Sequence, residues 1–346
     1  MKIDNHEISN SSGVFIIAEL SANHKQNLDI AIKTIKAAKR AGADCIKLQT
    51  YTPDTLTLNC NKDDFKIKDT IWSGKSYYQL YGEAFTPWEW HQKLFEVAKE
   101  EGLSCFSSPF DKSAVDFLEN LSVPAYKIAS FEITDIPLIR YVASKQKPVI
   151  ISTGIATRED IELAIQTCHE ENNFDIALLK CTSSYPAPIQ EANLGLMQRF
   201  KEDFNVLIGL SDHTLSNTAC IASTVLGGKI IEKHFILDRS IGGPDAEFSL
   251  DYKEFKDMVD AVRETEQCLG DGSYELTEKQ KSGRVFSRSL YISKDVKKGD
   301  TLNANNIKSI RPGHSLHPKY YNEILGKPVK KNLELGDRIK LDDIEL

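Results

Sequence analysis

Eight short apolar runs recur along the first 235 residues, and each ends in polar or charged residues. The runs cover 14–19, 45–49, 105–108, 126–130, 149–153, 176–180, 206–211 and 230–234. Short apolar runs with polar ends are typical of buried strands. Eight is the number of strands that a closed parallel barrel needs, and catalytic groups collect at the carboxyl ends of such strands. The pattern therefore predicts a (β/α)8 barrel of the α/β class.

Segments with helical periodicity separate these runs. Asn27 precedes an apolar helical face and Gly42 follows it, which predicts a helix between them. Three further helix starts have the spacing of a capping box, with a second polar side chain three residues after the cap: Thr86 with Glu89, Thr157 with Asp160, and Asp251 with Glu254. In the first of these, Pro87 occupies the expected first helical position. Alternating strands and helices favour a parallel sheet.

One connection, from Thr50 to Phe85, is too long for an ordinary loop between a strand and a helix. Loops of this length are usually functional, so we expect it to cover substrate at the mouth of the barrel. A surface elaboration without a catalytic part is the alternative.

The sequence changes character after Gly270, where a polar, glycine-containing stretch begins. We expect a barrel domain over 1–272, a linker over 273–284 and a small β-rich domain over 285–346. Within the last, 296–302 and 333–339 share the pattern apolar-x-x-Gly-Asp-x-apolar. This repeat predicts two similar Gly–Asp turns related by pseudo-symmetry.

Composition narrows the class of protein. Of 346 residues, 41% are hydrophobic and 27% charged, which is ordinary for a globular protein with a real core. The net charge of −7 argues against a nucleic-acid or membrane partner, so a few placed cations must hold any anionic substrate. Without an apolar span or a signal pattern, we expect a cytoplasmic protein. The seven scattered cysteines predict reduced core residues.

Two histidines lie at the ends of neighbouring predicted strands. His213 follows the seventh run and His234 ends the eighth. A closed barrel would bring both imidazoles within reach of one divalent metal and leave positions for water and substrate oxygens. Glu232 shares the side-chain parity of His234, so it is expected to support the metal site or to form a buried ion pair.

Lysines inside apolar strands are costly unless they meet an anion. Lys47 and Lys127 are therefore expected to bind a phosphate or carboxylate, although pairing with Glu19 or Glu132 is an alternative. Hydroxyls stand at nearby strand ends: Ser108, Ser130 and Ser152. Lys180 suggests an alternative mechanism, in which this lysine forms a Schiff base with the substrate. The pair of histidines argues against that mechanism. Carboxylates at Glu19, Glu132 and Asp245 could orient sugar hydroxyls or move protons.

Taken together, these motifs resemble the sialic acid synthase family over nearly the whole chain. The resemblance rests on residues 17–24, 47–50, 107–110, 127–130, 209–214 and 232–235. Residues 288–291 and 311–313 are similar to the antifreeze-like (SAF) domain of that family. Within the family, residues 18–24, 49–54 and 86–91 are most similar to the branch that makes pseudaminic acid.

The resemblance implies a reaction. Phosphoenolpyruvate would condense with an open-chain amino-sugar aldehyde and water, and phosphate would leave by C–O cleavage. A divalent metal, Mn, Mg or Co, would bind His213 and His234. The resemblance also gives the remaining side chains roles: Glu19, Lys47, Lys127, Glu132 and Asp245 in catalysis, and Gln49, Ser108, Ser130, Ser152, Tyr185, Ser211 and Arg311 in substrate binding.

Among these, Glu132 would stabilise a cationic centre at C2 of phosphoenolpyruvate. Arg311 of the C-terminal domain would reach the active site of a second subunit, which implies an interlocked, domain-swapped homodimer. The chain departs from the family at Ser315, where a glycine is usual; if that glycine has a positive φ, serine would be strained. N-acetylmannosamine or the legionaminic acid precursor is the alternative sugar. A Schiff-base aldolase and a silent sugar-binding barrel are more distant alternatives.

Overall fold

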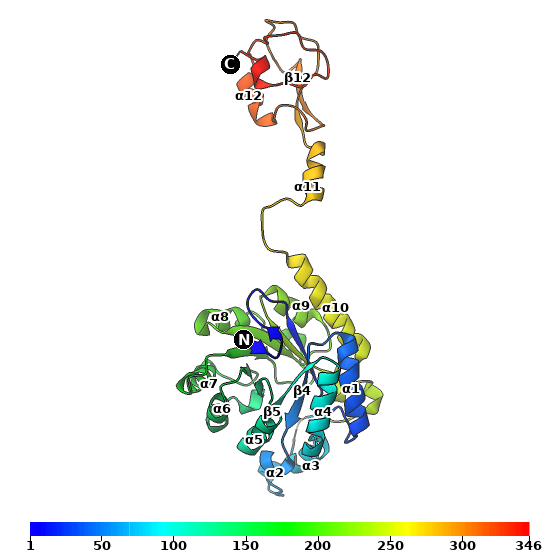
Figure 1. The fold of residues 1–346 in the computed structure, drawn as a ribbon, viewed down its shortest axis with the longest axis vertical. Coiled ribbons are helices and arrows are strands. Elements are labelled where there is room, and N and C mark those ends of the chain that lie inside the picture. The colour runs from blue at the N-terminus through cyan, green and yellow to red at the C-terminus, as the bar shows by residue number, and fades with distance from the viewer. Residues whose placement is uncertain (69, 346) are drawn as a thin grey trace. The chain divides into compact units, whose positions relative to one another are not determined.

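The first 270 residues form a closed barrel of eight parallel strands (Figure 1). The computed structural model describes residues 1–68 and 70–345. The strands are β3 (Phe15–Glu19), β4 (Cys45–Thr50), β5 (Ser104–Pro109), β6 (Tyr126–Ile128), β7 (Val149–Ser152), β8 (Ile176–Cys181), β9 (Leu207–Asp212) and β10 (Ile230–His234). Pairing of β10 with β3 closes the barrel. Each of the eight apolar runs is a barrel strand, so the predicted fold is confirmed.

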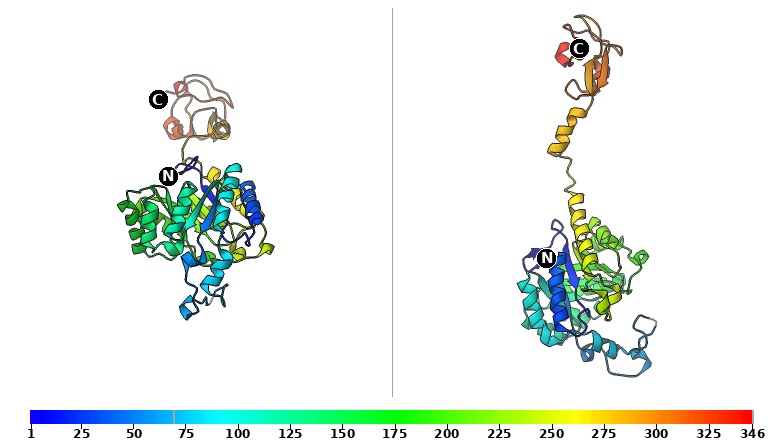
Figure 2. Two further views of the ribbon diagram at one scale, coloured as in Figure 1. Left: turned by 60° about the horizontal axis from the view of Figure 1, so that its bottom comes forward. Right: turned by 90° about the vertical axis from the view of Figure 1, so that its right-hand side faces the viewer.

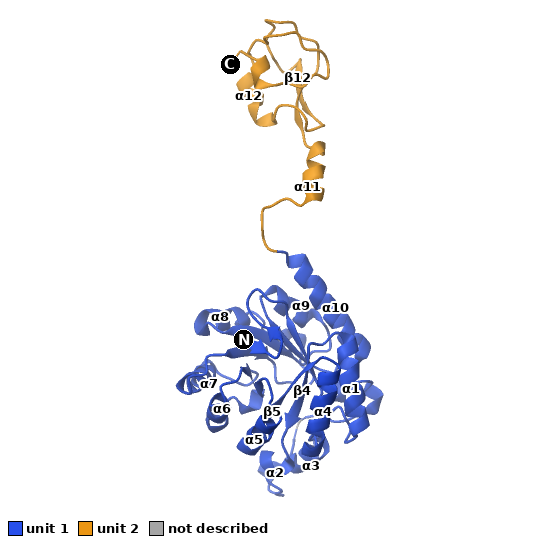
Figure 3. Cartoon of the chain, viewed as in Figure 1, with its two compact units in different colours: residues 1–270 blue, residues 271–346 orange. Residues whose placement is uncertain are grey.

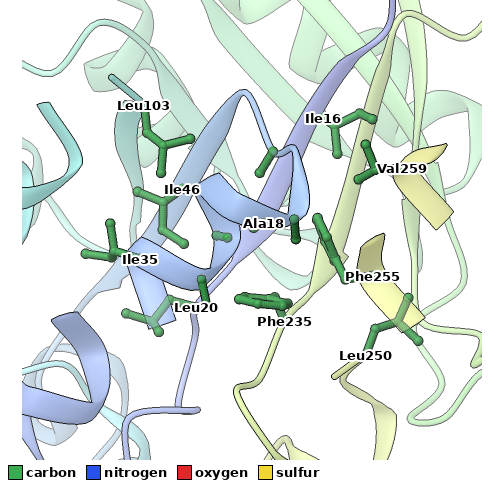
Figure 4. Close-up of a cluster of buried hydrophobic side chains, with 14 of the residues drawn as sticks. Ile16, Ala18, Leu20, Ile35, Ile46, Leu103, Phe235, Leu250, Phe255 and Val259 are labelled. Atoms are coloured by element: carbon green, nitrogen blue, oxygen red, sulfur yellow. The ribbon is translucent and has the colours of Figure 1, made fainter. Parts of the chain in front are cut away.

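Helices surround the barrel and pack on its outward side chains. They are α1 (Leu28–Ala41), α4 (Trp88–Glu100), α5 (Lys112–Asn120), α6 (Ile136–Ala143), α7 (Arg158–Glu170), α8 (Leu196–Phe204), α9 (Thr218–Val225) and α10 (Tyr252–Leu269). Figure 4 shows one part of this layer, where Ile16 and Ala18 of β3 face apolar side chains of α1 and α10. Burial of this apolar surface, at about 25 cal/mol per Å², is the main force that holds the helices to the strands.

The capping side chains set most of the predicted helix ends. Asn27 accepts the backbone N–H groups of Asp29 and Ile30, and Gly42 ends α1 with a φ of 94°. The capping boxes at the starts of α7 and α10 are both present. The box predicted at Thr86 is wrong. Its hydroxyl is buried and pairs with Nε2 of His24, and α4 begins at Trp88 without a side-chain cap.

Inward-facing side chains divide the barrel into an apolar half and a polar half. The apolar half contains Phe15, Ile17, Phe106 and Ile150. The N-terminal hairpin of β1 (Lys2–Ile3) and β2 (His6–Glu7) adds Ile3 to this cluster. Charged and hydroxyl side chains occupy the inward positions toward the carboxyl ends of the strands. Polar chemistry is thereby confined to one end of the barrel.

The long connection after β4 folds at this polar end. It contains α2 (Pro53–Leu56), the 3-10 helix η1 (Asp63–Phe65) and α3 (Tyr77–Ala84). Both views in Figure 2 place this insert at the opposite end of the barrel from the N-terminal hairpin. The remaining 3-10 helices of the first unit are η2 (Ser130–Glu132), η3 (Ile189–Glu191), η4 (Arg239–Ile241) and η5 (Ala246–Phe248), all after strand ends.

Residues Asp271–Leu346 form a second compact unit, coloured separately in Figure 3. It contains α11 (Glu278–Gly283), η6 (Arg284–Phe286), β11 (Ser289–Ile292), β12 (Ile307–Ile310), η7 (Pro318–Tyr320), α12 (Tyr321–Ile324) and η8 (Leu341–Asp343). Its core is a cluster of aliphatic side chains that includes Leu290, Val296 and Leu333. The ends that the sequence suggested for the linker, 273 and 284, stay a prediction.

The predicted repeat of two Gly–Asp turns is present in this unit. Gly299 and Gly336 have φ values of 87° and 92°. The carboxylates of Asp300 and Asp337 each accept a backbone N–H three residues upstream at 2.8 Å. An antiparallel bridge joins Val296 to Leu333, so the two turns lie across from each other.

Ser315 fits its position without backbone strain. It does not adopt a left-handed conformation. Its Oγ donates to the carbonyl of Leu290 and accepts the N–H of Ile339 at 2.7 Å. The serine therefore ties together three segments of the second unit.

All seven cysteines are free. Five are buried, as predicted. Cys60 is half-buried and Cys268 is exposed, so the prediction of a core position is wrong for these two. Across the described residues, no helix is long and apolar enough to cross a membrane. The cytoplasmic location stays a prediction.

Candidate active site

A cavity of about 410 Å³ opens at the carboxyl ends of the barrel strands. This is within the range of small-molecule sites. The predicted residues that line it come from four strands or the loops after them: Gln49, Ser130, Glu132, Tyr185, His234 and Asp245. The insert between β4 and α4 supplies much of the remaining wall. The barrel has thus gathered residues that lie up to 196 positions apart in the chain, from Gln49 to Asp245.

A layer of buried ion pairs adjoins this cavity. The Nζ of Lys47 lies 2.5 Å from Oε2 of Glu19 and 3.6 Å from Oε1 of Glu232. The Nζ of Lys127 lies 3.8 Å from the same oxygen of Glu232. All four groups meet because they occupy inward positions of β3, β4, β6 and β10. Lys47 thus does pair with Glu19, and Glu232 links the two lysines.

Burial and mutual charge set the protonation of this layer. Burial raises the pKa of Glu19 to about 7; Lys47 opposes this effect, and the negative charge of Glu232 adds to it. Burial also disfavours the charge of Glu232, yet Lys127 and Lys47 hold its pKa below the usual value. Desolvation lowers the pKa of Lys127. Of the two carboxyl groups in this layer, Glu19 is therefore the one that can exchange a proton near neutral pH.

Hydroxyl groups extend the cationic layer. Lys47 donates to Oγ of Ser108 at 3.1 Å, and Lys127 donates to Oγ of Ser152 at 2.6 Å. Ser130 accepts the backbone N–H of Gly154 at 2.8 Å. A Cβ at Gly154 would overlap the hydroxyls of Ser130 and Ser183. Glycine lets the backbone approach these serines, and the resulting donors and cations suit a phosphate or carboxylate.

The rings of the two histidines lie close together, with centroids 5.3 Å apart and an angle of 51° between their planes. Nδ1 of His213 is 3.0 Å from the carbonyl oxygen of Thr182. Nδ1 of His234 is buried, has no hydrogen-bond partner among residues 1–68 and 70–345, and lies 3.7 Å from a carboxylate oxygen of Asp245. Burial, and the positive charges nearby, hold the pKa of His234 well below its usual value, so this imidazole is neutral.

These features fit a metal in part. A neutral imidazole with an unpartnered buried nitrogen is a suitable ligand, and a carbonyl partner orients the other ring. Among the described residues, however, no group of three or more His, Cys, Asp or Glu side chains has a geometry that could hold a metal. The protein would supply two nitrogens, and water and substrate oxygens the other ligands. The metal site stays a prediction.

The carboxylate of Asp245 lines the cavity. Asp245 accepts hydrogen bonds from Oγ of Ser21 and, at 3.3 Å, from the N–H of Ala22, while burial raises its pKa. Gln49 donates to Glu19 at 3.1 Å. The ring of Tyr185 lies 4.5 Å from that of His213. Polar groups of the cavity therefore stand beside both the ion-pair layer and the histidines.

Other predicted residues lie elsewhere. Lys180 donates to the carbonyl of Cys181 and to Thr182, on the outward side of β8, so it does not reach the cavity. Ser211 donates to Glu232 at 3.3 Å rather than lining the cavity. Arg311 is exposed on the second unit.

Of the two roles expected for Glu232, the buried ion pair is the one present, with the two lysines as its partners. Other residues of this site were not predicted from the sequence. Gly154 and Ser183 were not singled out, although a glycine directly after a strand end is a signal of close backbone approach. Tyr51, Trp72 and Tyr81 line the cavity from the insert, and no spacing pattern marked them.

Glu132 gives the site a measurable pH dependence. Burial raises its pKa from 4.5 to about 7. The stabilisation from its protonated form is complete below pH 4.5 and is lost as the pH rises through about 7. As the pH rises from 5 to 7.5, we expect the titration of Glu132 to reduce the free energy of unfolding by about 2 kcal/mol. Glu132→Gln should lose that dependence in urea denaturation, whereas Glu191→Gln, at an exposed position, should keep it. Equal pH dependence in all three proteins would contradict the buried carboxyl.

Comparisons with known proteins agree with this arrangement. The model of the NeuB family matches residues 34–274, and the SAF domain model matches residues 287–345. A protein named pseudaminic acid synthase from Campylobacter jejuni (strain 81-176) is 53% identical over 95% of this chain and 96% of its own length. Its namesake from Helicobacter pylori is 49% identical over 95% and 97%.

More distant relatives carry other names. N,N'-diacetyllegionaminic acid synthase from Legionella pneumophila is 34% identical over 96% of this chain and 94% of its own length. Among solved structures, the spore coat polysaccharide biosynthesis protein spsE from Bacillus subtilis superposes with a TM-score of 0.69. It is 32% identical, and the match covers 100% of this chain and 99% of that chain.

Proposed function

The chain belongs to the NeuB family, and we propose that it condenses phosphoenolpyruvate with 2,4-diacetamido-2,4,6-trideoxy-L-altrose and water to give pseudaminic acid and phosphate. The observation that carries this proposal is the 53% identity, over nearly the full length of both chains, with a protein named for that activity. The relative named for legionaminic acid is 34% identical. The geometry of the site supports the proposal, because it combines buried cations with an adjoining cavity that could hold a sugar.

The ion-pair layer suits phosphoenolpyruvate. Lys47 and Lys127, with Ser108 and Ser152, would hold its phosphate and carboxylate. Because Glu19 and Glu232 already neutralise the lysines, an incoming anion has to compete with them, and protonation of Glu19 near pH 7 lowers that cost. Ser130 and the nearby N–H of Gly154 provide further polar contacts.

The reaction joins C3 of phosphoenolpyruvate to the aldehyde carbon, adds water at C2 and breaks the C2–O bond to phosphate. Glu19 would transfer a proton to the aldehyde oxygen as it gains charge. Glu132 would oppose the positive charge that develops at C2. Asp245 and Gln49 would orient sugar hydroxyls. A divalent ion on His213 and His234 would add Lewis acidity at the aldehyde oxygen.

Labelled substrate tests this reaction. With ¹⁸O at the bridging oxygen of phosphoenolpyruvate, we expect the label in the released phosphate and a product with the mass of a diacetamido nonulosonic acid. Unlabelled phosphate would contradict C–O cleavage. Trapping with borohydride and pyruvate should yield no adduct, since Lys180 lies outside the cavity.

We further infer a homodimer in which the second unit of one subunit covers the cavity of the other. Large apolar side chains are exposed in the loops that follow strands β6, β7, β8 and β9: Phe131, Ile155, Ile189 and Leu215. Exposed apolar groups around a cavity mark an interaction surface. Arg311, exposed on the second unit, would bind an N-acyl group of the sugar in the partner's site.

Mixed dimers test this arrangement. Purified hybrids of a Lys127→Met subunit and an Arg311→Ala subunit should have about half of wild-type activity, because one of the two sites keeps both residues. Each variant alone should be nearly inactive. If the hybrid is as inactive as the two homodimers, Arg311 does not act across subunits.

A further inference from the structure

The wall of the cavity differs in chemistry from one side to the other. Its acidic and basic side chains, Glu132, His234 and Asp245, come from barrel strands or the loops after them. The insert between β4 and α4 lines its side with neutral residues, four of which are aliphatic: Leu56, Ile67, Leu80 and Ala84. One side of the cavity thus suits polar groups, and the other an apolar group.

The aliphatic side of the cavity is held in place by its own hydrogen bonds. Ile67 donates its N–H to the carbonyl of Lys75 at 2.9 Å and accepts the N–H of Gly74 at 3.3 Å. Leu80 lies on α3, whose start has a complete capping box. Both side chains are nearly buried, at 5% and 7% exposure. The aliphatic surface is therefore already formed without a ligand, which reduces the entropic cost of binding.

Few polar groups of the insert remain available to a ligand. The indole N–H of Trp72 donates to the carbonyl of Pro244 at 3.0 Å. The rings of Tyr77 and Tyr81 stack at 6.0 Å, and their hydroxyls, with those of Tyr51 and Thr70, are the other polar side-chain groups that the described part of the insert brings to the lining. The four aliphatic residues of the insert, Leu56, Ile67, Leu80 and Ala84, contribute no polar side-chain group to the lining.

The orientation of the sugar follows from the reaction. Its aldehyde carbon must meet phosphoenolpyruvate, which the lysines and serines of the ion-pair layer would hold. The carbon chain would then run away from that layer, and its far end, C6, would reach the side formed by the insert. There a methyl group would meet aliphatic carbon, whereas a hydroxymethyl group would have to bury its hydroxyl against it.

We propose that Ile67 and Leu80 of the insert bind the C6 methyl group and select 6-deoxy sugars over their 6-hydroxy counterparts. This inference rests on the proposed function and names its specificity residues. An apolar pocket rejects an added hydroxyl only moderately, so we expect the wild type to favour the deoxy sugar by about 10- to 100-fold in kcat/KM.

Paired substrates test the proposal. The assay compares kcat/KM for 2,4-diacetamido-2,4,6-trideoxy-L-altrose with that for its 6-hydroxy counterpart. Leu80→Asn and Ile67→Thr should each reduce the preference at least about fivefold, mainly through KM for the deoxy sugar. Leu58→Asn is the matched control, since Leu58 belongs to the same insert but is 64% exposed and absent from the lining. It should keep the wild-type ratio.

The outcomes separate the two proposals. An unchanged ratio in both cavity variants, with activity retained, would overturn the selection by Ile67 and Leu80 and leave the function standing. Equal use of both sugars by the wild type would do the same. No turnover of either sugar by the wild type would instead overturn the proposed function.

Discussion

Replacing Lys127 by methionine is expected to lower kcat/KM for phosphoenolpyruvate by about 1000-fold. Loss of a single preorganised donor in an active site costs roughly 100- to 1000-fold, and here the donor is also a cation. Lys127 is buried, donates to Ser152 and lies 3.8 Å from Glu232. Methionine has a similar length, so packing changes little while Glu232 loses one of its two counter-charges. Steady-state kinetics at saturating sugar measure the effect.

The matched control is Lys180→Met, on strand β8 of the same barrel. Lys180 is also a buried lysine of a barrel strand, but its ammonium bonds the carbonyl of Cys181 outside the cavity. We expect less than about a threefold change in kcat/KM, since no substrate contact is lost. A large loss at Lys180 with full activity at Lys127 would favour the Schiff-base alternative and contradict the phosphoenolpyruvate site.

The second large effect is expected at the histidine pair. His213→Ala and His234→Ala should each lower the affinity for a divalent metal by more than about 100-fold, because even loss of a residue that only supports a ligand costs 10- to 100-fold. Metal content after dialysis against a chelating resin measures this directly, independent of activity. Phosphate release should fall in parallel.

His169→Ala provides the control, since this histidine is exposed on α7 outside the barrel. It should keep the metal content and activity of the wild type. If either variant of the pair binds metal as the wild type does, the two imidazoles are not the ligands. The unpartnered Nδ1 of His234 would then need another partner.

The barrel could be predicted from sequence because strand burial and helix capping leave local patterns. Each strand is a short apolar run, and Asn27, Thr157 and Asp251 cap helices where their spacing indicated. The prediction of a cap at Thr86 is wrong because its hydroxyl hydrogen-bonds the ring of His24 instead, and no local pattern reveals such a tertiary contact.

The site was predictable only where residue type and strand position suffice. Buried lysines and histidines at strand ends stand out because their burial is costly without a partner. The pairing of Glu232 with both lysines depends on barrel closure, which brings β10 beside β3 and near β4. The aliphatic side of the cavity depends on how the insert folds over the barrel end. No local pattern distinguishes Ile67 and Leu80 from other aliphatic residues in the sequence.

Phosphate release by metal-stripped protein, with and without added Mn, tests the central claim most directly. The assay supplies phosphoenolpyruvate with each of three sugars in turn: the 6-deoxy-altrose substrate, N-acetylmannosamine and the legionaminic acid precursor. We predict Mn-dependent release with the 6-deoxy-altrose sugar at a kcat/KM well above that with the other two. Preference for either of the others, or release with none of the three, would contradict the account.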